Sequence, residues 1–466
     1  MKILVTIVNY GTKNNKHLHS LIQEYRSMPF SVDITIVSNV LKDFGPAIPV
    51  VVGLPARNPW SLPFNHKKVL GSNVDNYDLF IYSEDDTLIT EEHIRSFLRI
   101  TEVLPEDEIT GFMRYELDNS NQKTISTIHS GYHWEPNSVK TIGEYTFARL
   151  TNDHSACYIL TQKQLKKAIA SGKYLVAPHK GRYDFICTAA TDPYTQCGFK
   201  KVVCISHIDE FLIHHMPDNY VGKYGIKYEE MKKQIDYLLT INNDMKSKSI
   251  LYNGEVNIPS VTWNKPYYEP TDDRLVALIP DTAKTVLSVG CGSGNAEAKI
   301  SALGKRVICV PMDDVMSVLI KDKGMEVVPS NFSEAYAALS KERFDVILLV
   351  DVLQFQREPT QVLREFAQLL GHDGRVIVRV PNFHYLGTIK DFILNKEPRK
   401  SYKNDFAKNK IHMTTLGMVK KWMKDGGLKH ILIEHDIAKA YQIYSKMLLD
   451  IFRTNFASRL YIVAKK

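Results

Sequence analysis

The stretch YDLFIYSEDDTLIT, residues 77–90, runs from an apolar segment directly into three consecutive carboxylates, Glu84, Asp85 and Asp86. Adjacent like charges repel, and a carboxylate at the end of a buried strand is costly to desolvate. A divalent cation that prefers oxygen ligands, such as Mg²⁺, Mn²⁺ or Ca²⁺, would resolve this conflict. The alternative is a solvated loop before a helix, although Thr90 already supplies the N-cap of that helix.

The stretch VGCGSG, residues 289–294, is a second place where the backbone could meet a ligand. It follows a predicted strand and opens a predicted helix. Glycines there let the backbone approach a ligand closely, and the helix N-terminus offers unpaired N–H groups. Taken alone the pattern is weak, because glycines also make tight turns between a strand and a helix.

Composition narrows the class of protein. Of the 466 residues, 44% are hydrophobic and 24% are charged, which is ordinary for a soluble globular protein of two or three domains. No run reaches the roughly 18 apolar residues of a membrane span, and the N-terminal MKILVTIVNYG reads as a buried strand, not a signal peptide. The six cysteines form no CxxC pair, so neither a zinc site nor a disulfide framework is predicted. We expect a reduced, cytoplasmic protein.

The net charge of +7 is unevenly distributed, because residues 390–410 carry seven Lys and Arg against three acids. Such a patch can meet an anionic membrane, a phosphorylated substrate or nucleic acid, and it can also be a solvated loop. No signature of a nucleic-acid-binding module surrounds it. We therefore expect no nucleic-acid partner, and a peripheral contact with the inner membrane face is one use that the patch allows.

The elements that must position these residues alternate between strand and helix. In the first half, helices are predicted at 15–28, 64–73 and 90–105, and strands are predicted at 2–10, 32–39, 48–55, 77–83 and 108–117. The near-continuous apolar runs of these strands are typical of a parallel sheet that is covered on both faces.

Periodicity is lost between residues 240 and 270, a region rich in Asn, Lys, Ser and Pro, which indicates a domain boundary. We predict an α/β protein with two domains, 1–245 and 265–466, joined by a linker at 246–264. The second half restarts the strand–helix rhythm. Its best-marked helix begins at Pro359, and Gly371 is its predicted C-cap.

The second half resembles class I S-adenosylmethionine-dependent methyltransferases. The likeness covers the turn VLSVGCGSG, the segment FDVILLVDVLQF, the stretch GHDGRVIVRVPN and the segment IHMTTLGMVKKWMKDGGL. It implies a Rossmann-like fold in which the turn at Gly290, Gly292 and Gly294 binds S-adenosylmethionine.

Three departures from that family affect the expected cofactor site. The acid that usually stands two residues before the first glycine is Ser288 here, and Pro311 stands where an acid usually binds the ribose hydroxyls. Asp313 could replace the ribose ligand if the strand end is shifted. Gln354 and Phe355 stand where many relatives have Glu-His. The alternative reading is a methyltransferase fold kept for structure or for substrate docking.

The first half resembles GT-A glycosyltransferases, which bind a nucleotide sugar through a DxD-type motif at the end of a central strand. The resemblance implies that Glu84 and Asp86, with Asp85 between them, hold Mn²⁺ or Mg²⁺ at the donor diphosphate. His214 and His215 follow a later strand, where several relatives complete the metal shell. A strand-end histidine pair can also be structural.

Other roles implied by the same resemblance concern the donor and the acceptor. Asn9 and Tyr10 would contact the base and ribose of the donor, and Asn65 and Lys67 would contact its diphosphate or ribose. The alternatives are a core tyrosine and a solvated helix face.

The base that activates the acceptor would be Asp184, with Asp192 as the second candidate. A role as a helix N-cap is the alternative for both. The preferred reading is therefore a metal-dependent glycosyltransferase fused to a methyltransferase-like domain. It would transfer sugar to a glycan or glycolipid acceptor, as in the assembly of a surface polysaccharide.

Two other readings remain. In one, methyl transfer is the only activity and the first half is a non-catalytic glycan-binding domain. In the other, both halves are scaffolds, although the intact acidic triplet argues against this. Hydrolysis of a nucleotide sugar would favour the glycosyltransferase reading over both.

Overall fold

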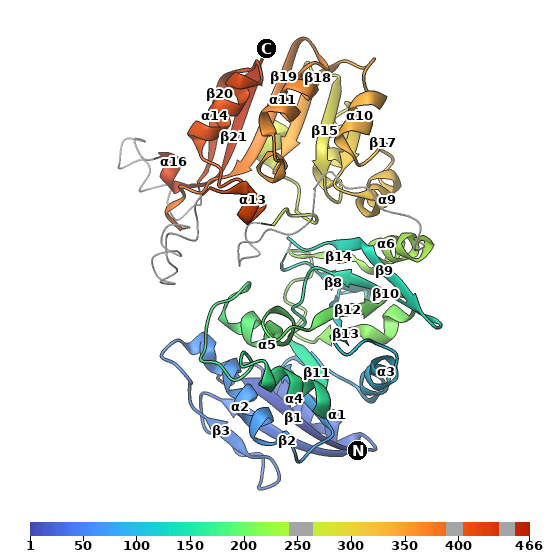
Figure 1. Cartoon of the computed structure of the whole chain (residues 1–466), viewed down its shortest axis with the longest axis vertical. Helices are drawn as coiled ribbons and strands as arrows, with labels where there is room; N and C mark the ends of the chain where they lie inside the picture. Colours follow the sequence, from blue (N-terminus) through green and yellow to red (C-terminus); the bar gives the residue numbers. More distant parts are fainter. Residues whose placement is uncertain (130, 242–263, 388–403, 438–452) are drawn as a thin grey trace. The chain divides into compact units, whose positions relative to one another are not determined.

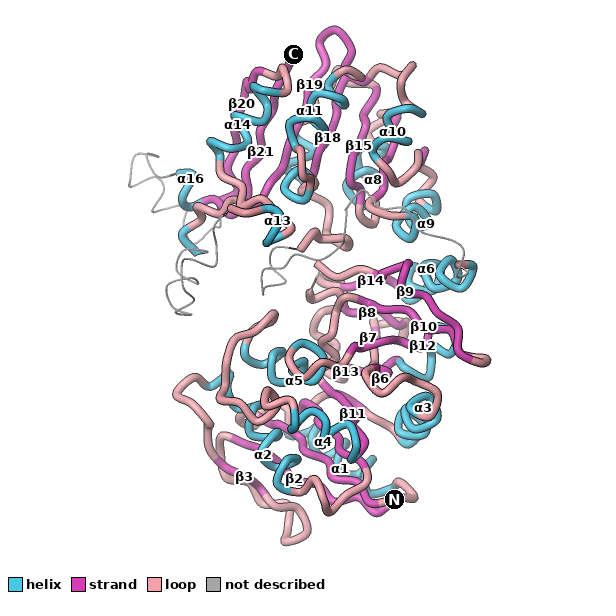
Figure 2. Tube along the Cα trace, viewed as in Figure 1, coloured by secondary structure: helices cyan, strands magenta, loops and turns pink. Residues whose placement is uncertain are grey.

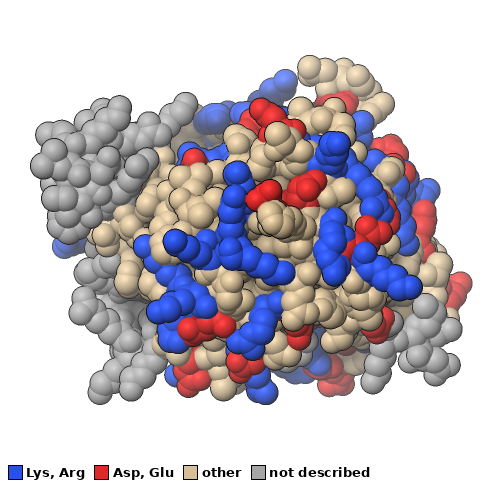
Figure 3. Space-filling view, turned by 90° about the horizontal axis from the view of Figure 1, so that it is seen from above, with Lys and Arg blue, Asp and Glu red and all other residues tan. Residues whose placement is uncertain are grey.

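The computed structural model describes residues 1–129, 131–241, 264–387, 404–437 and 453–466. The chain divides into two compact units, Met1–Met245 with Pro259–Val261, and Lys246–Ile258 with Thr262–Lys466. The predicted linker, apart from residue 264, lies outside the described residues, as does the part of the basic segment from 390 to 403. Lys and Arg side chains lie among Asp and Glu side chains across the face that Figure 3 shows. Within the described ranges, no helix is both long enough and apolar enough to cross a membrane.

The first sheet of the N-terminal unit has five strands, in the order β11-β4-β1-β2-β3 (Figure 1). Its parallel strands are β1 (Lys2–Asn9), β2 (Ser31–Ser38), β3 (Val50–Val52) and β4 (Leu79–Glu84), and β11 (Cys157–Thr161) runs antiparallel to β4. Every residue of β1 after the first is buried, as its apolar run predicts. The helices packed against the sheet are α1 (Asn15–Ser27), α2 (Asn65–Ser72) and α4 (Gln162–Ala170).

A four-stranded sheet with the order β6-β12-β10-β9 and a five-stranded sheet with the order β14-β8-β7-β13-β5 complete the N-terminal unit. Their strands are β5 (Thr87–Leu88), β6 (Glu108–Thr110), β7 (Met113–Leu117), β8 (Lys123–Ser126), β9 (Trp134–Ile142), β10 (Tyr145–Leu150), β12 (Lys200–Cys204), β13 (Leu212–His215) and β14 (Gly225–Lys227). The helices of this part are α3 (Glu91–Thr101), α5 (Phe185–Thr195) and α6 (Tyr228–Thr240).

The single strand predicted over 108–117 is wrong, because β6 and β7 belong to different sheets. The break falls at Gly111, whose N–H donates to the carbonyl of Val202 at 2.8 Å. A Cβ at Gly111 would collide with the side chain of Lys201. The chain can turn from one sheet to the other there because glycine leaves that space free.

The C-terminal unit is built on one seven-stranded sheet with the order β17-β16-β15-β18-β19-β21-β20 (Figure 2). The strands are β15 (Thr285–Cys291), β16 (Arg306–Pro311), β17 (Glu326–Val327), β18 (Phe344–Val350), β19 (Leu370–Pro381), β20 (Lys429–Ile437) and β21 (Ala457–Lys465). All neighbours are parallel except β21, which is antiparallel to β19 and β20. The strand order reverses between β15 and β18, and ligands of such sheets bind beyond the carboxyl ends of the strands at that point.

The helices of the C-terminal unit include α7 (Asp273–Ala277), α8 (Asn295–Ala302), α9 (Asp314–Asp322), α10 (Phe332–Ala338), α11 (Pro359–Ala367), α13 (Phe406–Asn409), α14 (Leu416–Asp425) and α16 (Arg453–Phe456). Pro359 is the first residue of α11, as predicted. The predicted C-cap at Gly371 is wrong. The helix ends at Ala367, and Gly371 is already part of β19, because Leu370 pairs with Phe344 of β18.

Candidate functional site

The three consecutive carboxylates lie at the carboxyl end of β4. Glu84 is the last residue of that strand, and Asp85 and Asp86 form the turn before β5. Asp85 and Asp86 are only 7% and 9% exposed. All three line a cavity of about 650 Å³ within the N-terminal unit. The predicted acidic site is therefore a buried cluster that faces a ligand-sized space.

Amide groups hold this acidic cluster in place. The side-chain amide of Asn9 donates to Asp85, and Asn14 Nδ2 donates to Asp85 Oδ1 at 2.8 Å and to Asp86 Oδ2 at 3.0 Å. Burial, with repulsion from Asp86, raises the pKa of Asp85 to about 7 and the pKa of Glu84 to about 7. The side-chain amide nitrogen of Asn9 binds Asp85, and its contact with a nucleotide stays a prediction.

His215 of β13 faces the acidic cluster, and His214 does not. His215 Nε2 lies 3.6 Å from Asp86 Oδ2, and His215 Nδ1 lies 2.6 Å from a carboxylate oxygen of Glu116. Burial alone would lower the pKa of His215, but the two carboxylates outweigh it and raise this pKa to about 9. His214 hydrogen-bonds to Asp218 at 3.1 Å. The structure thus brings only the second histidine to the predicted metal site, because neighbouring strand residues point to opposite faces.

The acidic cluster has free ligand atoms. Glu84 Oε1 and Asp86 Oδ1 are buried and accept no hydrogen bond from any described residue. Unmade hydrogen bonds of buried carboxylate oxygens cost free energy. A cation with oxygen ligands would satisfy both atoms, and His215 could add a nitrogen ligand. The residues present therefore fit a divalent metal ion.

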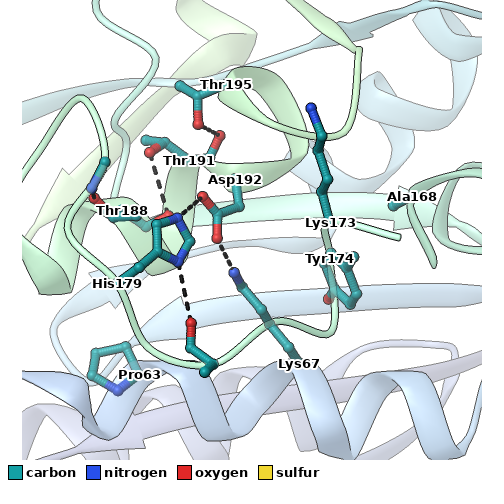
Figure 4. Close-up of polar contacts among 12 residues, drawn as sticks. Pro63, Lys67, Ala168, Lys173, Tyr174, His179, Thr188, Thr191, Asp192 and Thr195 are labelled. Carbon is teal, nitrogen blue, oxygen red and sulfur yellow. Dashed lines mark hydrogen bonds and ion pairs between the residues drawn. The ribbon is translucent and has the colours of Figure 1, made fainter. Parts of the chain in front are cut away.

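Asp184 and Asp192, the two predicted bases, have different surroundings. Asp184 lines the cavity and caps α5, where its Oδ1 accepts from Cys187 N at 2.9 Å. Asp192 is fully buried and forms an ion pair with the equally buried Lys67 of α2 (Figure 4). His179 Nε2 lies 3.4 Å from the other oxygen of Asp192. The described lining of the cavity includes Asp184 but neither partner of the ion pair.

The placement of Lys67 and Asp192 corrects both predictions for these residues. They were assigned to the donor phosphate and to the acceptor, but they neutralise each other in the core between α2 and α5. Asn65 also differs from its prediction, since its amide donates to the carbonyl of Gly53 at 2.9 Å. Tyr10 lines the cavity and is 55% exposed, so its contact with the donor base and ribose stays a prediction.

The sequence patterns did not single out several residues that line the same cavity, including Arg114, His129, His154, Cys187 and Tyr220. They come from separate strands, loops and helices. Burial lowers the pKa of both His129 and His154. One sequence signal for a site residue is available at His154, which lies in the polar stretch NDHS directly before an apolar strand.

The glycine turn of the C-terminal unit joins β15 to α8. Gly290 and Gly294 have φ values of 88° and 79°, which only glycine adopts readily. Gly292 serves another purpose, because a Cβ there would collide with the carbonyl oxygen of Tyr267. That oxygen accepts a hydrogen bond from Ser293 N at 2.7 Å. The group that approaches Gly292 closely is thus the backbone of Tyr267 and not a ligand. The turn places the start of α8 at the carboxyl end of β15.

A carboxylate stands beside Ser288, although the strand itself lacks an acid. Ser288 Oγ donates to Glu297 Oε1 at 2.7 Å, and both residues are buried. Glu297 lies in the first turn of α8. Glu297 is not among the site residues that the sequence patterns predict. A residue of the helix thus places a carboxylate beside Ser288, where the resemblance implies an acid on the strand.

Asp313 follows the end of β16 and has another role than the predicted one. The strand itself ends at Pro311, as the predicted register has it. Asp313 is the N-cap of α9, its Oδ1 accepts from Met316 N at 2.8 Å, and it is 2% exposed. Burial raises its pKa to about 7. The carboxylate therefore serves the helix, which corrects its predicted role as a ribose ligand.

An arginine cluster lies near the carboxyl ends of β18 and β19. Arg379 is 1% exposed and contacts three carboxylates, those of Asp351, Asp272 and Glu269. Burial alone would raise the pKa of Asp351, but Arg379 and further cations outweigh it and lower this pKa. Asp272 and Glu269 belong to the segment that also supplies Tyr267, so this cluster fixes that segment next to the glycine turn.

Most of the C-terminal unit matches the model of a known protein family. Residues 264–433 match the family model of a methyltransferase domain. The C-terminal unit has the Rossmann-like methyltransferase fold. The match begins just before the segment that carries Tyr267 and ends within β20, so it contains the glycine turn and the arginine cluster.

Individual relatives and solved structures are similar to part of the chain. A ubiquinone biosynthesis O-methyltransferase of Stutzerimonas stutzeri is 29% identical over 155 residues, which is 31% of this chain and 64% of the relative. One of Pseudomonas putida is 30% identical over 156 residues, covering 31% of this chain and 65% of the relative. The chain thus spans less than two thirds of these relatives. The crystal structure of an S-adenosylmethionine-dependent methyltransferase of Archaeoglobus fulgidus covers 42% of this chain and 90% of its own, with 16% identity and a TM-score of 0.33.

Proposed function

We propose that the C-terminal unit transfers a methyl group from S-adenosylmethionine. The observation that carries this proposal is the match of residues 264–433 to a methyltransferase domain, with the glycine turn at the carboxyl end of β15. This turn stands where the strand order reverses, which is where ligands of doubly wound sheets bind. The cofactor would supply an electrophilic methyl group on a sulfonium.

The residues around the turn fit the amino-acid end of this cofactor. Glu297 offers a buried carboxylate for the cofactor's ammonium group, and Ser288 fixes the orientation of that carboxylate. The N–H groups at the start of α8 suit the cofactor's carboxylate. Methyl transfer needs the donor and the nucleophile held in line, so positioning is the main task of these residues.

Crosslinking tests this proposal without knowledge of the acceptor. Labelled S-adenosylmethionine is irradiated with the full chain, and the labelled peptides are mapped. We expect the label within residues 285–314, and excess unlabelled S-adenosylhomocysteine should suppress it. Label that appears only in the N-terminal unit, or label that the competitor does not suppress, would contradict the proposal.

A second function is supported by the cavity of the N-terminal unit. We propose that it binds a nucleotide sugar through Mn²⁺ or Mg²⁺ and transfers the sugar to a glycan or glycolipid. The free oxygens of Glu84 and Asp86, with His215 beside them, support this reading. A bound metal ion would neutralise the diphosphate leaving group. Asp184 lines the same cavity and is the candidate to accept the proton of the acceptor hydroxyl.

Nucleotide binding separates this second function from a non-catalytic glycan-binding domain. Nucleoside diphosphates are titrated into the full chain with and without Mn²⁺. We expect binding that requires Mn²⁺ and that Asp86→Ala removes while the fold is kept. Mn²⁺-dependent binding that survives in Asp86→Ala would contradict the metal assignment. Glycan binding with no nucleotide binding would support the non-catalytic reading, in which methyl transfer is the only activity.

A further inference from the structure

Two imidazoles and one thiol meet on the wall of the cavity in the N-terminal unit. His129 lies in the loop after β8, His154 lies just before β11, and Cys187 lies in the first turn of α5. One nitrogen from each histidine and the sulfur all lie within 4.8 Å of one another. Nitrogen and sulfur together are the donor set that zinc prefers, in contrast to the oxygen-rich cluster at the end of β4.

The distance between two of these atoms fits a shared metal ion. Cys187 Sγ lies 3.6 Å from His129 Nε2. Tetrahedral zinc with bonds of about 2.3 Å to sulfur and about 2.0–2.1 Å to nitrogen places these two atoms roughly 3.6 Å apart. The pair therefore needs almost no movement to bind the ion.

His154 provides an independent indication of a missing partner. Its side chain is 3% exposed, and neither ring nitrogen has a hydrogen-bond partner within the described part of the chain. Glu84 Oε1 lies 3.7 Å from His154 Nε2, too far for a hydrogen bond. Buried polar groups are normally paired, so an imidazole with two unpaired nitrogens requires an explanation.

A catalytic pair of Cys187 and His129 is the competing interpretation of these residues. Such a pair uses one imidazole and leaves His154 without a partner. A metal ion explains both histidines and the thiol at once. All three residues line the cavity, so a fourth coordination position would open toward that space.

We propose that His129, His154 and Cys187 bind one zinc ion, with a water molecule at the fourth position. Three protein ligands and one open position are the arrangement of zinc sites that act on substrates, whereas structural sites are closed by four protein ligands. This inference concerns the N-terminal unit and does not depend on the methyltransferase function.

Cobalt substitution tests the site directly. The full chain is stripped of metal with a chelator and titrated with Co²⁺, which reports thiolate ligation by a charge-transfer band in the near ultraviolet. We expect the band to saturate at one equivalent and Zn²⁺ to displace the cobalt. Cys187→Ala should remove the band, and His154→Gln should weaken Co²⁺ binding at least tenfold.

Matched variants keep the test independent of folding and of the acidic cluster. Cys204→Ala changes a buried cysteine of β12 that is not in the group, and it should keep the band. Asp86→Asn should also keep the band. Circular dichroism checks that each variant is folded. A folded wild-type chain without the band would overturn the proposal, as would a band that survives Cys187→Ala. Co²⁺ bound without the band and lost in Asp86→Asn would place the metal in the acidic cluster only and would also overturn it.

Discussion

Ser288 Oγ donates a hydrogen bond of 2.7 Å to Glu297 Oε1, so a residue of β15 and a residue of α8 together present one buried carboxylate beside the glycine turn. The resemblance to methyltransferases implies an acid on the strand, and here a carboxylate beside the strand comes from the helix. The proposed binding of the cofactor's ammonium group depends on this arrangement.

Replacement of Glu297 tests that role. Glu297→Gln keeps the size of the side chain and its hydrogen bond to Ser288 but removes the charge. A charge-assisted hydrogen bond is worth roughly 1.5–3 kcal/mol, so the dissociation constant for S-adenosylhomocysteine should rise about 10- to 100-fold. Glu334→Gln, on the exposed side of α10, should leave it unchanged. Equal affinities of the two variants, measured by calorimetry, would contradict the assignment.

Gly292 gives a prediction about stability. Gly292→Ala should force the Tyr267 segment away from the turn, because the new Cβ would collide with the carbonyl of Tyr267. Overpacking of this kind typically costs about 1–3 kcal/mol. Gly417→Ala is the matched control, since a Cβ at Gly417 meets no atom within 4 Å. Chemical denaturation should show a lower midpoint only for Gly292→Ala, and equal midpoints would show that the segment does not pack on the turn.

For the buried pair of Lys67 and Asp192, we expect the loss of one partner to destabilise the protein much more than the loss of both. Lys67→Met leaves the carboxylate of Asp192 buried without its cation, which typically destabilises a protein by about 3–5 kcal/mol. The double variant Lys67→Met/Asp192→Leu should recover most of this loss, since no unpaired charge remains. Urea unfolding of the two variants measures the difference. A double variant no more stable than Lys67→Met would show that the charge of Asp192 is not the cause.

The carboxylates at the end of β4 predict a pH dependence. Burial raises the pKa of Glu84 to about 7, so the folded state holds its proton more tightly than the unfolded state. Stability of the metal-free protein should therefore fall as the pH rises from about 4.5 to 7. Glu84→Gln should raise the thermal midpoint at pH 8 and change it little near pH 4. A midpoint gain that is the same at both pH values would contradict the assigned pKa.

Local sequence patterns predicted much of the fold because their causes are local. The apolar run of β1 and the Pro359 start of α11 need no distant partner. The break at Gly111 was missed because its cause is Lys201, which lies 90 residues further along the chain. The same limit applied to Gly371, whose place in β19 follows from pairing with β18.

In the candidate sites, too, features with a local cause were predicted and features that depend on distant residues were not. The acidic cluster and the glycine turn are continuous in sequence, so both were recognised. Lys67 and Asp192 were assigned to ligands because nothing in either segment reveals an ion pair between residues 125 positions apart. The group of His129, His154 and Cys187 joins three separate segments without a CxxC motif, so only the folded chain brings it together.

Calorimetric titration of the full chain with S-adenosylhomocysteine tests cofactor binding by the C-terminal unit without the need for an acceptor. We expect saturable binding at one site in the micromolar range, weakened by Glu297→Gln and unaffected by Asp86→Ala in the other unit. Absence of binding at millimolar ligand, with the protein folded, would contradict this expectation and leave the C-terminal unit a methyltransferase fold without its cofactor.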